Sequence, residues 1–205
     1  MTRPAYIRLT GSLLAAWFLA EAAAAQFGWL GGTPGQPPIQ LLAAVLIPLG
    51  AIAAGCVSSS SFRSFLLSLS PKILTQLQAW RVGGFVFLVL ARYAILPPEF
   101  ALSAGWGDIT IGATATLVAL RLSTPQHKTS FVIWQILGIT DLIVAVSLGA
   151  TTNLFHPHSI PTTPMSVLPL SLIPTFAVPL LLVVHIICIA QALRWKQPST
   201  ESPLP

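Results

Sequence analysis

Six long apolar runs constrain this chain more than any other feature of its sequence. A run of about 17 to 25 apolar residues forms a helix that can cross the roughly 30 Å hydrocarbon layer of a bilayer. The runs are Leu9–Leu30, Ile39–Val57, Leu77–Leu96, Ile109–Leu122, Phe131–Thr151 and Val167–Leu193. The fourth is the shortest and needs residues 105–108 to reach full length. The pattern predicts an all-α integral membrane protein, a bundle of six transmembrane helices.

The balance of apolar and charged residues argues against a soluble protein. The chain is 54% hydrophobic and only 7% charged, whereas a soluble domain has roughly 25% charged residues. Very little sequence lies outside the runs, so there is no room for a second, soluble domain. We expect residues 1–196 to form a single polytopic transmembrane domain and residues 197–205 to form a short disordered cytoplasmic tail.

The distribution of basic residues predicts the orientation. If all six runs cross the membrane, nine of the ten Lys and Arg residues fall on one side, which also holds both termini. Cytoplasmic links carry the excess of Lys and Arg, so we expect N-in/C-in topology in the cell (inner) membrane. The net charge of +5 then reflects topology and attraction to anionic lipid headgroups. The expected partner is the lipid bilayer, with other membrane proteins or a homo-oligomer as further candidates; nucleic acid is not expected.

The N-terminal run has two interpretations. Arg3 and Arg8 precede an apolar stretch that ends in small residues at Ala23–Ala25, and this pattern is typical of a cleaved secretory signal peptide. Cleavage would leave five spans and an exported N-terminus. We adopt the alternative, in which the segment is retained as a membrane-anchoring helix.

The link from the second to the third run predicts an additional short helix. Phe62, Phe65, Leu66 and Leu69 recur there at helical spacing beside several serines. That spacing favours an amphipathic cytoplasmic helix lying in the membrane interface between the second and third spanning helices. A helix that docks on a partner protein would show the same pattern.

The stretch 92–112 concentrates charge in a chain that has little of it. It holds Arg92, Glu99 and Asp108 between two apolar runs, and prolines and glycines interrupt it. We interpret it as the turn between the third and fourth helices. Ionisable groups inside a bilayer are costly unless they are paired or functional. We therefore expect Arg92 to dip below the outer surface and pair with Asp108, which would open the fourth helix. Arg81 is placed near the inner surface and has no assigned role.

Asp141, His185 and Glu21 complete the expected buried polar array, which also contains Arg92 and Asp108. Asp108 and Asp141 each lie on a stripe of small residues, which marks close helix packing, so both should face the bundle interior. His185 lies below three prolines that should break the sixth helix, and Glu21 lies within the first run. Each acid has a structural interpretation, a protonated carboxyl held by its neighbours, and a functional one, a proton- or cation-binding group.

Two features suggest cofactors, although none is predicted. His156 and His158, in the last outer link, could bind a transition metal if a third ligand approached. His185 could serve as an axial haem ligand. The sequence contains no nucleophile elbow and no phosphate-binding loop, which disfavours an enzyme.

The leading functional hypothesis is a transporter-like or channel-like protein. In this hypothesis Asp141 and His185 handle a proton, a cation or a small solute, and Arg92 with Asp108 forms an outer gate. The first alternative is a noncatalytic subunit or assembly factor of a larger membrane complex, in which the same charges are internal ties. The second is a membrane redox protein that binds haem through His185.

Overall fold

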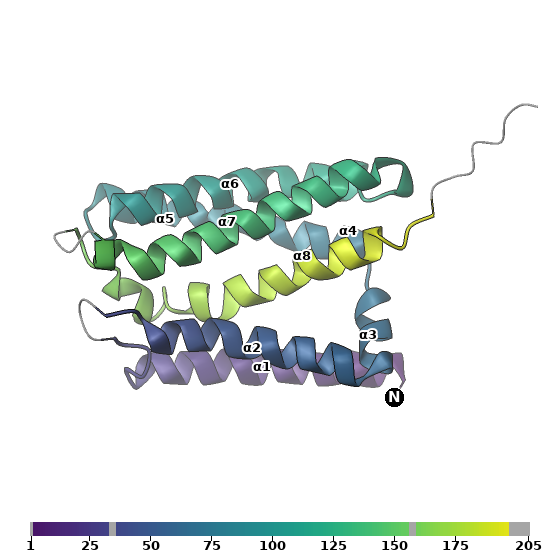
Figure 1. The fold of residues 1–205 in the computed structure, drawn as a ribbon, viewed down its shortest axis with the longest axis horizontal. Coiled ribbons are helices and arrows are strands. Elements are labelled where there is room, and N and C mark those ends of the chain that lie inside the picture. The colour runs from purple at the N-terminus through teal and green to yellow at the C-terminus, as the bar shows by residue number, and fades with distance from the viewer. Residues whose placement is uncertain (1, 33–35, 156–158, 197–205) are drawn as a thin grey trace, which may run out of the picture.

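The computed structural model describes residues 2–32, 36–155 and 159–196, and the regular elements in these segments are helical. Figure 1 shows the long helices lying side by side along one axis. The α-helices are α1 (Arg3–Gln26), α2 (Ile39–Ser58), α3 (Ser60–Leu67), α4 (Pro71–Gln76), α5 (Phe85–Arg92), α6 (Pro98–Arg121), α7 (Lys128–Phe155) and α8 (Val178–Ala192). Shorter segments are the 3₁₀ helices η1 (Leu77–Gly84), η2 (Pro125–His127) and η3 (Thr163–Ser166) and the π-helix η4 (Ile173–Ala177).

Five helical segments are long and apolar enough to cross a membrane. They are Arg3–Gln26, Ile39–Ser58, Pro71–Arg92, Pro125–Thr152 and Ile173–Ala192. At 1.5 Å of rise per residue, even the 20-residue segments span about 30 Å. The all-α architecture is confirmed, and the five segments indicate a multi-pass membrane protein. Helix α6 has 24 residues but is less apolar and is not among the five, so the count of six spans stays a prediction.

The third spanning segment changes its helical form in the middle. The helices α4, η1 and α5 follow one another without a break from Pro71 to Arg92. Runs of 3₁₀ helix longer than three or four residues are uncommon, yet η1 has eight. Because a 3₁₀ helix has three residues per turn, Gln78, Arg81 and Gly84 line up on one side. All three are buried.

The turn after this segment is shorter than the sequence suggested. Helix α6 already begins at Pro98, a residue suited to the first helical position, so the turn comprises only residues 93–97. Glu99 lies in the first turn of α6, and Asp108 lies in the middle of that helix. The expectation that the fourth helix begins at Asp108 is therefore wrong.

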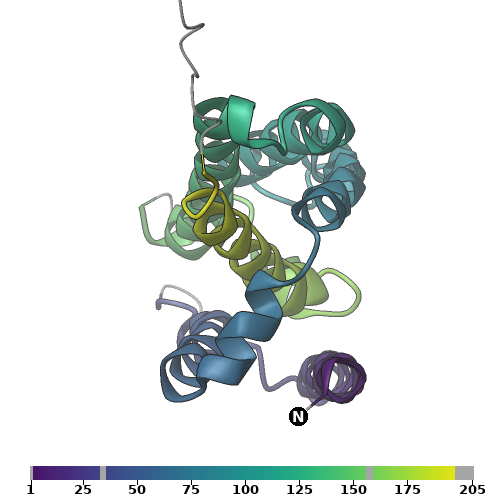
Figure 2. The same cartoon turned by 90° about the vertical axis from the view of Figure 1, so that its right-hand side faces the viewer.

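Helix α8 occupies the centre of the bundle. Viewed end-on in Figure 2, it lies between the group formed by α5, α6 and α7 on one side and the helices α1 and α2, which lie apart from each other, on the other. Ten residues of α8 are buried, including His185, Cys188 and Gln191. In contrast, the only buried residue of α1 is Ala25 and that of α2 is Val45. The apolar side chains that α1 and α2 expose suit a lipid environment.

Most basic residues gather at one end of the bundle. The start of α1, helix α3, the start of α4, the turn between α6 and α7 and the end of α8 all lie at the same end in Figure 1. These segments carry Arg3, Arg8, Arg63, Lys72, Arg121, Lys128, Arg194 and Lys196. The charge asymmetry along the bundle is thus present in the fold. The assignment of this end to the cytoplasm stays a prediction.

The short helix expected between the second and third spans is present as α3. Its first turn is capped, since the Phe62 amide donates to the Ser59 hydroxyl oxygen at 3.2 Å. Its apolar face packs on protein: the Phe65 ring stacks on Tyr6 of α1 with 5.1 Å between ring centroids. The Gln191 side chain of α8 donates to the Leu69 carbonyl oxygen at 2.8 Å. A location in the membrane interface stays a prediction, but Phe65 does not face lipid.

The predicted break in the first half of the last apolar run is confirmed, and the location of this half toward the outer side of the membrane stays a prediction. Pro169 and Pro174 lie in the segment between η3 and α8, Pro174 within the π-helix η4, and Pro179 is the second residue of the regular α-helix that begins at Val178. A proline removes a backbone donor and clashes with the preceding turn, so regular α-helix cannot extend through this segment. The predicted disordered tail at residues 197–205 lies outside the described residues.

Candidate functional site

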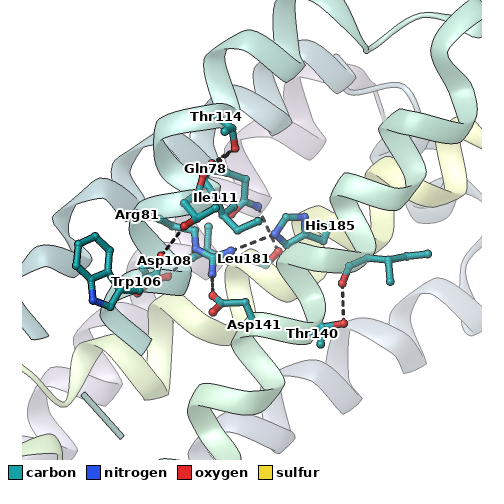
Figure 3. A network of polar contacts seen from close by, with 12 residues as sticks. Gln78, Arg81, Trp106, Asp108, Ile111, Thr114, Thr140, Asp141, Leu181 and His185 are labelled. Carbon is teal, nitrogen blue, oxygen red and sulfur yellow. Dashed lines mark hydrogen bonds and ion pairs between the residues drawn. The ribbon is translucent and has the colours of Figure 1, made fainter. Parts of the chain in front are cut away.

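A buried arginine lies at the centre of a polar network that joins four helical segments (Figure 3). The Arg81 side chain is 1% exposed. Its Nε donates to Asp108 Oδ1 of α6 at 2.7 Å, and its Nη2 donates to Asp141 Oδ2 of α7. Its Nη1 lies 3.4 Å from His185 Nε2 of α8. A guanidinium presents five N–H donors in a rigid plane. One side chain of η1 thereby contacts three other helices.

The hydrogen bonds beyond Arg81 run in one direction. A guanidinium has no acceptor, so His185 Nε2 must accept and the ring proton must reside on Nδ1. His185 Nδ1 then donates to Gln135 Oε1 at 2.5 Å, and Gln135 Nε2 donates to Thr75 Oγ1 at 3.1 Å. The Thr75 hydroxyl is left to donate to Cys188 Sγ at 3.8 Å. His185 is therefore a neutral imidazole whose tautomer is set by Arg81.

The charges of the network do not balance. The network contains one guanidinium, two carboxylates and a neutral His185, so with both carboxylates ionised its net charge is −1. Charges interact strongly in a medium of low dielectric constant, and an uncompensated charge within a membrane is costly. One further positive charge, either a proton on the carboxylate pair or a bound cation, would make the network neutral.

Glycines let the helices approach closely around these side chains. A Cβ at Gly107 would collide with the Asp141 carboxylate, and a Cβ at Gly138 would collide with the His185 ring. The same close approach, to Asp108 and to the backbone of η1, is found at Gly84 and Gly112. Small residues at helix contacts are how membrane helices pack tightly. The sequence stripes that predicted close packing around Asp108 and Asp141 are explained by these contacts.

A cavity of about 490 Å³ leads to one of the two acids. Helix α6 lines it with Phe100, Ala104 and Asp108, which share a face because they are spaced four residues apart. Gly31 and Gly32, in the loop before α2, line its other end. Asp108 is the only charged residue among its described lining residues. The cavity is thus a mainly apolar space whose lining also includes hydroxyl and amide side chains, such as Ser159, Thr163 and Gln36, and the carboxylate of Asp108.

The expected pairing of Arg92 with Asp108 is corrected by the structure. Arg92 is exposed at the end of α5, whereas Asp108 pairs with Arg81. The reason is the early start of α6. Counted from Ile95 at the centre of the turn, Asp108 lies 13 residues later and Arg81 lies 14 residues earlier. Two antiparallel helices therefore bring these two residues to the same depth, far from Arg92.

The other members of the expected array have separate locations. Asp141 and His185 both contact Arg81, as described above. Glu21 lies on α1 one turn after Trp17, whose ring packs on Phe176 of η4 with 4.7 Å between centroids. Glu21 also lies beside Thr175 of η4. It therefore belongs to the contact between α1 and η4 and not to the network around Arg81.

Besides Arg81, sequence reasoning missed Thr75, Gln78 and Gln135, which are buried near the network. Thr75, Gln78 and Gln135 each have no exposed surface. The Gln78 amide nitrogen lies 3.5 Å from the Leu181 carbonyl oxygen, and its Oε1 has no hydrogen-bond partner among the described residues. A usable signal was present, because Thr75, Gln78 and Arg81 recur every third residue. Polar residues with that spacing at the start of an apolar run indicate a face turned toward protein.

The residues present do not fit a haem at His185. Both ring nitrogens are engaged, by Arg81 and Gln135, and Gly138 packs directly against the ring. Iron at either nitrogen would displace one of these partners. Among the described residues, no cluster of three His, Cys, Asp or Glu side chains could hold a metal ion. His156 and His158 lie outside the described residues.

The fold and the network define a class, a multi-pass α-helical membrane protein with a small buried polar network. Residues 37–193 match the family described as "Domain of unknown function (DUF8737)". The match covers more than half of the chain, so the chain belongs to this family. It includes every residue of the network and leaves α1 outside. No curated protein and no solved structure matches the chain.

Proposed function

We propose that this chain is a small transporter-like membrane protein that binds and releases a proton or a monovalent cation at Asp108 and Asp141. The observation that carries the proposal is that these two carboxylates share a single buried guanidinium, that of Arg81. Two carboxylates beside one cation favour retention of one proton by the pair, because both cannot ionise at low cost. Such a pair exchanges its proton for another cation without loss of neutrality.

In this proposal α6 also crosses the membrane, as the fourth of six spans in chain order, and residues 1–196 form a single transmembrane domain. Its 24 residues have a length of about 36 Å, enough to cross the hydrocarbon layer. With six spans both termini lie on one side. The basic residues at that end favour the cytoplasmic side of a cell (inner) membrane.

The two acids have different roles in this proposal. Asp108 lines the cavity, so it is the carboxylate that meets an incoming solute. Asp141 lies against Gly107 and holds the second carboxylate beside Arg81. His185 accepts from Arg81 and so keeps the guanidinium plane directed at both acids. It acts as a positioning residue, while the carboxylates carry the exchanged charge.

Infrared titration of the purified protein in lipid nanodiscs tests the shared proton. The protonated carboxyl and the ionised carboxylate absorb at different frequencies, so a pH series reports their interconversion. We expect a titrating carboxyl band in the wild type that is lost in both Asp108→Asn and Asp141→Asn, because either variant is neutral without a proton. The matched control is Glu99→Gln, at an exposed acid of α6, which should retain the band. A band that survives both single variants would assign the proton elsewhere.

One observation favours a second candidate, a structural tie with no exchange. Arg81 contacts three helices through three of its nitrogens, as expected of a residue whose role is to hold these helices together. In that case both carboxylates remain ionised, and each Asn variant loses a charge-assisted hydrogen bond that stabilises the fold by about 1.5–3 kcal/mol. The wild type would then show no titrating band from this pair.

A further inference from the structure

The cavity beside Asp108 suggests a chemical class of ligand, an inference that rests on the proposed function. We infer that it binds an organic monocation, an ammonium group attached to an apolar aryl or alkyl body, and that this ammonium replaces the proton on the carboxylate pair. The cavity lies outside the hydrogen-bond relay through His185. Its lining comes from α6, α7, the segment before α8, and the loop before α2 with the first turn of that helix; it is mostly apolar, with a few hydroxyl and amide side chains and Asp108.

The sign of the ligand's charge follows from the groups that face Asp108. Arg81, from η1, donates to Asp108 Oδ1. Asp141, from α7, binds the same guanidinium, and the neutral His185, from α8, lies behind it. The sum of these charges is −1 when no proton is present. A cation at Asp108 neutralises the network, whereas an anion there would add to an unpaired negative charge.

The shape of the ligand follows from the lining of the cavity. Along α6, Phe100 lies eight residues before Asp108, which places their backbones about 12 Å apart along the helix axis. Phe100 packs edge-to-face with Phe87, with 5.6 Å between ring centroids, and both rings line the cavity. Between them and the acid lie Ala104 and, on α7, Ala145. An apolar body several bonds long would cover this wall while its charged end meets Asp108.

The volume also favours an organic cation over an inorganic one. A cavity of about 490 Å³ falls in the range of small-molecule sites, roughly 300–1,000 Å³. A bare metal ion would use one carboxylate and leave the apolar wall in contact with water or lipid. An arylalkylammonium satisfies both features, since burial of its body is favourable in proportion to its apolar area.

Competition with the proton is a direct consequence. When the pair retains one proton, an arriving ammonium must displace it, and the overall charge of the site does not change. The proton leaves the carboxyl group and is released to water, so one proton appears in solution for each ammonium bound. By linkage, the apparent affinity then rises by about tenfold for each pH unit while the pair is protonated.

Equilibrium binding to the full-length protein in nanodiscs tests the inference with three matched probes. These are 4-phenylbutylammonium, the neutral alcohol 4-phenylbutan-1-ol and the ammonium ion, with empty nanodiscs measuring partition into lipid. We expect the first probe to bind best, with release of one proton per molecule in weakly buffered solution. Asp108→Asn should weaken its binding by about tenfold or more, as expected for loss of a charged hydrogen bond, and should leave the alcohol unchanged.

A second variant fills the space and leaves the charges in place. Ala145→Leu should weaken both 4-phenylbutylammonium and the alcohol while the infrared titration of the carboxylate pair persists. The inference is overturned if the alcohol or the ammonium ion binds as well as 4-phenylbutylammonium, or if Asp108→Asn and Ala145→Leu both leave its binding unchanged. A normal infrared titration in that case would preserve the proposed function, whereas loss of the titration in the wild type would remove it.

Discussion

The helices on the two sides of α8 are held in place by different kinds of contact. On one side, η1, α6 and α7 meet α8 through buried polar side chains around Arg81. On the other, α1 and α2 contribute few buried residues, and α1 meets η4 mainly through Trp17, Phe18 and Phe176. The first side lies wholly within the family match, and α1 lies outside it. The buried polar contacts around Arg81 therefore lie within the part of the chain that matches the family.

This difference has a physical basis in the membrane. Lipid tails are as apolar as leucine side chains, so apolar contacts alone give helices little preference for one another. Charged hydrogen bonds and glycine-mediated close contacts have specific geometries, and both occur on the η1–α6–α7 side. On the α1 side the contacts are mainly aromatic, from Trp17 and Phe18 to η4 and from Tyr6 to α3, with Glu21 beside Thr175. We therefore expect substitutions on the first side to affect the whole fold and those on the second to act locally.

The largest effect is expected from Arg81→Met. Removal of the guanidinium leaves Asp108 and Asp141 buried without a partner, and loss of one member of a buried ion pair costs about 3–5 kcal/mol. The free energy of unfolding in mixed detergent micelles, followed by circular dichroism, measures this loss. Acidic buffer should reduce the loss, because protonated carboxyl groups no longer need a cation. The control is Arg92→Met, at an exposed site, which should change stability by less than about 0.5 kcal/mol.

Neutralisation of the acids should give a non-additive result. Asp108→Asn or Asp141→Asn alone leaves one positive and one negative charge, so each should stay within about 1 kcal/mol of the wild type. The double variant leaves Arg81 buried without a counter-ion and should lose about 3–5 kcal/mol. The same unfolding assay measures this double-mutant cycle. Additive losses in the two single variants would favour the structural tie over the shared proton.

The sequence predicted the helices better than it predicted their polar partners. The apolar pattern of a helix repeats over many residues. The helices were therefore predicted correctly, although the start of α6 was placed eleven residues too late. A side-chain pair depends on the depth of each residue, and depth follows from where the turn begins. Placing the turn over residues 92–112 therefore paired Asp108 with Arg92, whereas the observed turn at 93–97 places it opposite Arg81.

A second part of the site could not be read from the residue types alone. Asp141 and His185 were recognised because ionisable groups within apolar runs are rare. Gln135 and Thr75 carry no charge and resemble ordinary tolerated polar residues in a sequence. Their role depends on tertiary contacts, since Gln135 bridges His185 to Thr75 across different helices. In the sequence, only the three-residue spacing of Thr75, Gln78 and Arg81 indicated that these side chains face other helices.

Paired glycine substitutions sharpen the comparison between the two sides. A Cβ at Gly138 of α7 would collide with the His185 ring, so Gly138→Ala should destabilise the fold by about 1–3 kcal/mol. A Cβ at Gly50 of α2 meets open space. Gly50→Ala should therefore stabilise its helix by about 0.5–1 kcal/mol, because alanine loses less conformational freedom. Unfolding in mixed micelles measures both, and equal effects would contradict the assignment of specific packing to the α7 side.

The smallest and most local effect is expected from Phe176→Leu. This side chain of η4 contacts Trp17 and Phe18 at 4.7 and 5.3 Å between ring centroids, and replacement retains an apolar group while removing the ring contacts. Aromatic pairs stabilise by about 0.5–1.5 kcal/mol beyond their buried area. We expect faster amide hydrogen exchange in α1, with exchange in α6 and α7 unchanged, because no polar contact links α1 to Arg81 among the described residues. Faster exchange throughout α7 would show that the two sides of α8 are coupled, and the contrast between a specific and a loosely held side would then fail.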